Sequence, residues 1–327
     1  MSAPAAPRSA IAGVMPMILK RIGVALLTLL LVSAVVFTIS GLLPGDAAQE
    51  TLGQSATPEQ VAALRHEMGL DRPAATRYVE WLSDIVQGDP GRSLVANMPV
   101  KEVIAGRLPN SLMLAGITAL VSVPLALLIG ITAAINRGGL LDRGLSLMTL
   151  SLVAVPEFLI ATLAVLVFSV TLLWLPSIAL VSSDATWSQT LRSTALPVLT
   201  LTISVMAQMA RMTRAAVADQ LDRPYVEMAH LKGVPFRRIV LYHVMPNAIG
   251  PMINAIALSL SHLLGGAIIV ETIFNFPGLA SLMVNAVTSR DMPLLQACAM
   301  IFCTAYLLLM LVADVVAILA NPRLRAQ

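Results

Sequence analysis

The chain has 327 residues, of which 57% are hydrophobic and only 12% are charged, and its mean hydropathy is +0.83. Soluble domains carry about 25% charged residues, so this composition excludes a water-soluble globular protein. The net charge of +3 does not indicate a nucleic-acid partner, because the basic residues stand at the ends of apolar runs, as they do in membrane proteins. We therefore expect a membrane protein in contact with lipid and with no nucleic acid.

Six apolar runs are long enough to cross about 30 Å of hydrocarbon as helices, which predicts an all-α integral membrane protein with six transmembrane helices. They comprise residues 18–43, 111–135, 144–175, 194–214, 251–274 and 293–319. The first is too long for a signal peptide and lacks a cleavage site, which indicates an uncleaved anchor. The third contains Pro156, which predicts a kink or a short interfacial lead-in.

The positions of lysine and arginine predict the orientation, because basic residues in short loops resist translocation. The two short outer loops hold only Arg192 and Arg290, whereas thirteen basic residues fall in the segments that we place inside. These thirteen are Arg8, Lys20, Arg21, Arg137, Arg143, Arg211, Arg214, Arg223, Lys232, Arg237, Arg238, Arg323 and Arg325. We predict cytoplasmic tails over 1–17 and 320–327 and a five-helix core over 111–319.

The segment 44–110 is predicted to be a small helical insertion outside the membrane, after the first span. Thr57-Pro58-Glu59-Gln60 forms a capping box with proline at the first helical position. An apolar stripe that includes Tyr78 and Trp81 predicts a second helix, and Pro99 begins a third.

The inner segment 215–250 contains EMAHLKG from Glu227 to Gly233, then Val234-Pro235, then a second helix-like run to Asn247. A glycine at a helix end with proline two residues later predicts two short helices joined by an elbow at 233–235. A helix that only anchors Arg237 and Arg238 to anionic lipid would not need this elbow.

The segment resembles the EAA motif of permease subunits of ATP-binding-cassette (ABC) importers. Glu227, Ala229, Gly233 and Met245-Pro246 match that motif, and Met228 departs from its middle alanine. Further blocks narrow the resemblance to the first permease subunit of the dipeptide, oligopeptide and nickel branch. These blocks are LLPGDAA at 42–48, MGLDRPAATRYVEWL at 68–82, GDPGRSL at 88–94, RLPNSLMLA at 107–115, VETIFNFPGLASLM at 270–283 and RDMPLLQA at 290–297.

The resemblance implies a type I importer permease fold in the bacterial inner membrane, with 44–110 in the periplasm. It implies transport of di- or oligopeptides from a periplasmic solute-binding protein, with nickel, glutathione-like peptides, opines or sugars as alternative cargo. The partners would be a second homologous permease and two ATPase subunits or domains. ATP and Mg²⁺ would be bound by those ATPases, so this chain would be no enzyme and bind no cofactor. The sequence contains no Gly-Lys-Ser/Thr phosphate loop, which agrees with ATP binding by separate subunits.

The resemblance also implies a role for the elbow as a coupling helix that docks in a cleft of the ATPase. Glu227 would pair with a basic residue of that partner, and Gly233 would permit the tight turn. The implied coupling residues are Glu227, Ala229, Gly233, Pro235, Arg237 and Arg238.

Three acidic residues fall inside or at the ends of the apolar runs, where each needs a partner or a wet cavity. Glu157 either lines a substrate path or pairs with Arg137, Arg143 or another chain. Asp314 stands near the inner end, close in sequence to Arg323 and Arg325, which favours an ion pair or helix packing. For Glu271, which lies in the VETIF block, we expect a structural and gating role.

The fifth run carries a polar stripe that includes Asn254, Ser261 and His262, which we expect to line the pathway together with Glu157. A lone histidine such as His262 is usually a donor between helices. A proton-coupled secondary transporter that uses Glu157, Asp314 and His262 is the rival function, but the internal inverted repeats that it predicts are not found. The cysteines and histidines lack metal-ligand spacing, so no metal site is expected.

Overall fold

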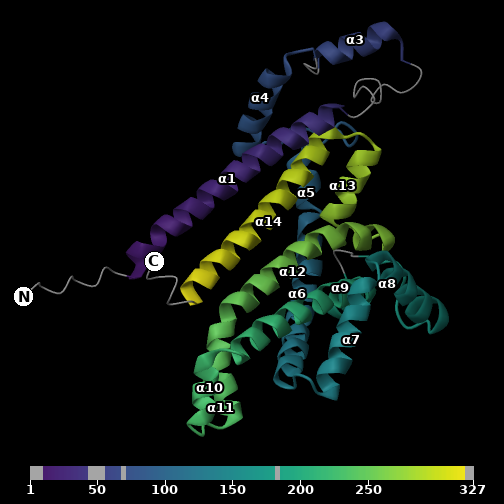
Figure 1. The fold of residues 1–327 in the computed structure, drawn as a ribbon. Helices are drawn as coiled ribbons and strands as arrows, with labels where there is room; N and C mark the ends of the chain where they lie inside the picture. Colours follow the sequence, from purple (N-terminus) through teal and green to yellow (C-terminus); the bar gives the residue numbers. More distant parts are fainter. Residues whose placement is uncertain (1–9, 43–55, 68–70, 181–184, 321–327) are drawn as a thin grey trace, which may run out of the picture.

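The computed structural model describes residues 10–42, 56–67, 71–180 and 185–320 (Figure 1). Over this part of the chain, five helices are long and apolar enough to cross a membrane, and a bent pair makes a sixth span. The five are α1 (Ala10–Leu42), α6 (Leu108–Ile135), α9 (Trp187–Leu221), α12 (Met245–Ile273) and α14 (Met292–Ala320). This architecture confirms the predicted fold class.

The sixth span is broken at Pro156, where the sequence predicted a kink. Helix α7 (Leu140–Ala154) ends, Val155 and Pro156 are extended, and α8 (Glu157–Ala164) continues through a π-helical turn, η1 (Val165–Thr171). The two halves meet at an angle of 97°. Proline explains the break, because its ring disfavours a helical conformation in the residue before it.

Between α1 and α6, the described residues form three helices, α3 (Pro58–Glu67), α4 (Ala74–Val86) and α5 (Val100–Ala105). The capping box is present: the Gln60 side chain accepts from the Thr57 N–H at 3.0 Å, and the Gln60 N–H donates to Thr57 Oγ1 at 3.4 Å. Tyr78 and Trp81 of α4 lie with their ring centroids 5.4 and 5.6 Å from that of Phe37 on α1. These contacts fix α4 to the C-terminal half of α1.

Helices α6 and α9 form the centre of the bundle. The buried face of α6 presents a residue every four positions, and most are small: Leu114, Thr118, Ser122, Ala126, Gly130 and Ala134. Small side chains let two membrane helices approach closely. A Cβ at Gly130 would lie only 2.6 Å from the carbonyl oxygen of Ala210 on α9, so the contact requires glycine.

Helix α1 lies along α14 at the rim of the bundle (Figure 1). Arg21 forms an ion pair with Asp314 toward one end, and Gln296 donates to Ser40 at 2.5 Å toward the other. Asp314 thus pairs with Arg21 of the neighbouring helix, whereas Arg323 and Arg325 lie outside the described residues. Between these contacts, α1 exposes leucine and valine side chains, as a lipid-facing helix does.

Candidate functional site

The elbow forms where the sequence placed it. Helix α10 (Pro224–Leu231) is capped by Lys232 and followed by Gly233, whose φ of +75° suits glycine. The Gly233 N–H donates to the His230 carbonyl at 2.9 Å, and the Val234 N–H donates to the Ala229 carbonyl at 3.1 Å. This pair of bonds is a Schellman motif, which closes the helix, and Pro235 then begins α11 (Phe236–Ile239).

The second short helix that we expected is not separate from the fifth span. Residues Phe236–Ile273 form one continuous helix of 38 residues, in which α11 passes through a π-helical turn, η2 (Val240–Val244), into α12. Pro246 explains the local widening, because it lacks an N–H and its ring crowds the preceding turn. The elbow is therefore joined to α12 without a break in the helix.

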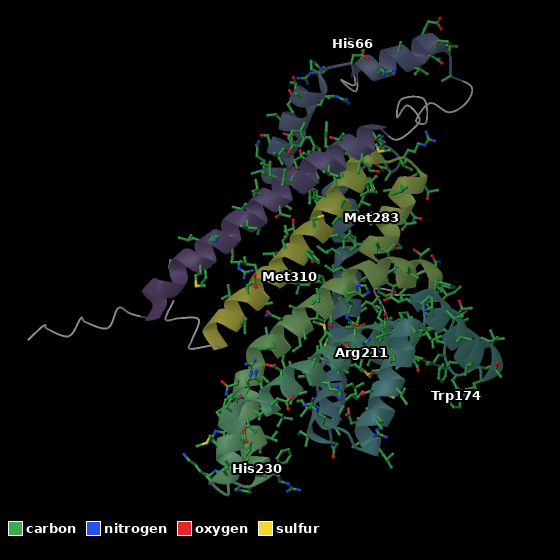
Figure 2. All side chains as sticks on the ribbon, in the orientation of Figure 1. His66, Trp174, Arg211, His230, Met283 and Met310 are labelled. Atoms are coloured by element: carbon green, nitrogen blue, oxygen red, sulfur yellow. The ribbon has the colours of Figure 1, made fainter. Side chains whose placement is uncertain are left out.

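The elbow presents a mixed surface at the end of the molecule opposite α3 and α4, where Figure 2 labels His230. Glu227, Lys232 and Pro235 are exposed, as are Arg237 and Arg238. Leu231 is 77% exposed and Phe236 40% exposed, and a hollow of about 480 Å³ beside α10 includes Glu227, His230 and Leu231. Ala229 is instead buried in a cluster with Val217 and Ala134, so it packs the elbow onto the bundle.

Two ion pairs join the C-terminal end of α9 to the first turn of α7 and to the turn between α6 and α7. Arg214 donates to both carboxylate oxygens of Asp142, from Nε at 2.6 Å and from Nη2 at 2.8 Å. Arg137 donates to Asp222 at 2.6 Å. Asp142 is buried, and the Gly138 N–H donates to it as well, at 3.0 Å. Asp142 was not predicted as a site residue, because its neighbours in the sequence do not indicate an ion pair with an arginine 72 positions away.

Asp219 of α9 pairs with an arginine at the start of the elbow. Arg223 donates to Asp219 at 2.8 Å, and this hydrogen bond raises the pKa of the guanidinium above its usual value. The ion pair thus holds Arg223 beside the hollow that contains Glu227.

Glu157 lies where α8, α9 and α12 meet. It is the first residue of α8, and Ser204 of α9 donates to its Oε1 at 2.5 Å. A Cβ at Gly266 of α12 would lie 2.6 Å from its Oε2, so the carboxylate rests directly on that glycine. Arg137, one of the partners considered for Glu157, pairs with Asp222 instead, and no described cation forms an ion pair with Glu157.

A cavity of about 910 Å³ opens among α1, α7, α9, α12, α13 and α14. Ser261 and His262, two of the residues expected along the pathway, line it from α12, and Ser204 and Gln208 line it from α9. Glu157 borders it through Ser204. Asn254 is exposed on α12 about two helical turns from Ser261, outside this lining.

Glu271 is fully buried and fixes the short helix α13 (Leu279–Thr288). Its carboxylate accepts from Ser111 Oγ at 2.6 Å and from the N–H groups of Ala280 and Ser281 at 2.8 and 2.9 Å. These N–H groups belong to the first turn of α13, which lacks acceptors within the helix and favours negative charge. This geometry gives Glu271 a structural task; its expected part in gating stays a prediction.

Asp291 is a second buried acid that the sequence analysis missed. Ser93 donates its hydroxyl to Asp291, as does the Leu94 N–H at 3.2 Å, so the turn at 93–95 is tied to the start of α14. The Leu294 N–H also points at it, at 3.4 Å. An aspartate just before a helix whose second residue is proline is a typical N-cap pattern. This pattern could have identified Asp291 from the sequence.

Comparison with known proteins agrees with this geometry. Residues 126–326 match the family described as binding-protein-dependent transport system inner membrane component, and residues 14–115 match the N-terminal family of such components. A Brucella abortus protein named as a peptide transport system permease is 35% identical over 94% of this chain and 98% of its own length.

The glutathione transport system permease protein GsiC of Salmonella choleraesuis is 37% identical, with the same coverage of each chain. A chain of the inward-facing MetNI methionine ABC transporter shares the fold, with a TM-score of 0.54, 16% identity, and coverage of 68% of this chain and 97% of that one. The chain therefore belongs to the family of inner membrane components of binding-protein-dependent ABC importers.

Proposed function

We propose that this chain moves di- or oligopeptides, glutathione-like peptides included, across the bacterial inner membrane while separate ATPase subunits bind and hydrolyse ATP with Mg²⁺. The observation that carries the proposal is the exposed elbow at 224–239, continuous with a helix that lines a polar cavity. The names of the Brucella and Salmonella relatives support a peptide as cargo.

The elbow has the chemistry of a docking surface. Leu231 and Phe236 are exposed at an end where we place the cytoplasm, so an ATPase cleft rather than lipid would cover them. Glu227 stands among them and would meet a basic residue of that cleft. Because Ala229 and the Schellman bonds hold the elbow rigid, a push on it moves α12.

Two further partners are part of the proposal, a second permease subunit and a solute-binding protein. A second homologous permease would close its exposed side, and a periplasmic solute-binding protein would deliver cargo at the end that carries α3 and α4. Both termini would then lie in the cytoplasm. Glu271, which holds α13, and Asp314, which holds α1, would keep the outer and rim helices in place as the pathway opens.

Reconstitution of the complete complex with Glu227→Ala tests the coupling role. We expect ATP-driven peptide uptake to fall strongly while the chain still inserts and assembles. Glu59→Ala, an exposed acid on α3 at the opposite end, is the control. Uptake that persists without any ATPase and follows a proton gradient would instead support the secondary transporter.

A further inference from the structure

The open face of α9 carries a polar stripe along its inner half. Ser204 is half-buried, and Gln208, Arg211 and Asp219 are exposed, as is Ala215, the one apolar member of the stripe. Their spacing of three or four residues places them on one side of the helix. Helix α1, by contrast, exposes mostly leucine and valine. Because polar groups facing lipid are costly, this stripe must face water or another protein.

Two groups of opposite charge, one beside this stripe on α8 and one within it, have unused hydrogen-bonding capacity. Ser204 is the one described donor to the Glu157 carboxylate, which can accept about four hydrogen bonds. Arg211, which lies in the central part of the molecule (Figure 2), has no ion pair or hydrogen bond among the described residues. Asp219, further along, is already paired with Arg223.

The spacing of the two charges sets the size of a ligand that would satisfy both. Ser204, which holds Glu157, precedes Arg211 by seven residues, a rise of about 10 Å along the helix. An extended peptide spans about 3.3–3.6 Å per residue. About three residues therefore cover the interval, with an ammonium group at one end and a carboxylate at the other.

We infer that Glu157 and Arg211 form a binding site for a short zwitterionic peptide, in which Glu157 accepts from the α-ammonium group and Arg211 donates to the α-carboxylate. Gln208, between them, lines the cavity and supplies a donor and an acceptor for a peptide bond. Gly266 keeps the carboxylate of Glu157 in place by leaving it room. The inference rests on the proposed function, since it names the cargo of the same pathway.

Uptake by the complete complex in proteoliposomes, with binding protein and ATP, tests the site. The probes are trialanine with free ends, its C-terminal amide and pentaalanine, and each rate is divided by the wild-type rate so that the preference of the binding protein cancels. We expect Arg211→Gln to lower trialanine uptake about tenfold, as the loss of a charge-assisted hydrogen bond would. Uptake of the amide and of pentaalanine should change less than about twofold.

Matched variants separate binding from folding. Glu157→Gln should impair trialanine more than N-acetyl-trialanine, and Arg143→Gln, an exposed arginine on α7 away from the stripe, should change none of the ratios. If Arg211→Gln lowers the uptake of trialanine and of pentaalanine by the same factor, the inference is wrong, while the proposed function still stands. If the wild-type complex takes up no peptide, the proposed function is wrong and the inference falls with it.

Discussion

Replacing Gly130 by alanine should force α6 away from α9. The new Cβ would lie 2.6 Å from the Ala210 carbonyl oxygen and 2.7 Å from the Cβ of Thr213, whereas ordinary contacts begin near 3.4 Å. The helices must therefore separate by most of an ångström. Overpacking of this kind costs about 1–3 kcal/mol. Alanine also raises helix propensity by about 1 kcal/mol, which masks part of the loss.

Gly116→Ala is the matched control, because Gly116 lies on the same helix with nothing within 4 Å of its Cβ position. Both variants gain the same propensity, so their difference isolates the contact. We expect Gly130→Ala to be less stable than Gly116→Ala by about 1–3 kcal/mol, or roughly 5- to 150-fold in the unfolding constant. Titration with SDS in mixed micelles, followed by circular dichroism, measures this difference. Equal midpoints would refute the tight contact between α6 and α9.

Three further predictions concern the polar contacts. Asp142→Asn weakens the paired bonds from Arg214, so the free energy of unfolding should fall by about 1.5–3 kcal/mol in the same titration, and an unchanged midpoint would contradict this. Gly233→Val strains a left-handed residue by about 1–2 kcal/mol, so uptake should drop while membrane insertion, checked by protease accessibility, persists. Glu271→Gln should speed amide hydrogen exchange in the first turn of α13; unchanged exchange would mean that the carboxylate does not hold it.

Local features of the fold could be predicted because their cause lies within a few residues. The break at Pro156 and the elbow at Gly233 each depend on one residue type with a distinct backbone preference, and the capping box depends on two side chains three residues apart, Thr57 and Gln60. The membrane spans follow from composition in the same way. The merging of the second elbow helix into α12 was not foreseen, since the sequence alone does not fix whether Pro246 ends a helix or only widens it.

The contacts that complete the site could not be predicted, because they join residues far apart in the chain. Asp142 and Arg214 are 72 residues apart, and Ser93 and Asp291 are 198 apart. A sequence shows that a buried acid needs a partner, as it did for Glu157, but not which helix supplies it. The carboxylate of Glu157 accepts from Ser204 and does not pair with an arginine. The reason is the 97° bend between α7 and α8, which places Glu157 against α9.

The ion pair between Arg21 of α1 and Asp314 of α14 has a consequence for the biogenesis of the protein. Arg21 and Asp314 are 293 residues apart, and chains are synthesised at about 5–20 residues per second, so the first helix waits about 15 to 60 s for its last partner. During that interval α1 must persist in the bilayer without its neighbour α14. Its leucine- and valine-rich surface suits it to that wait, and Arg21 stays near the membrane boundary until the aspartate arrives.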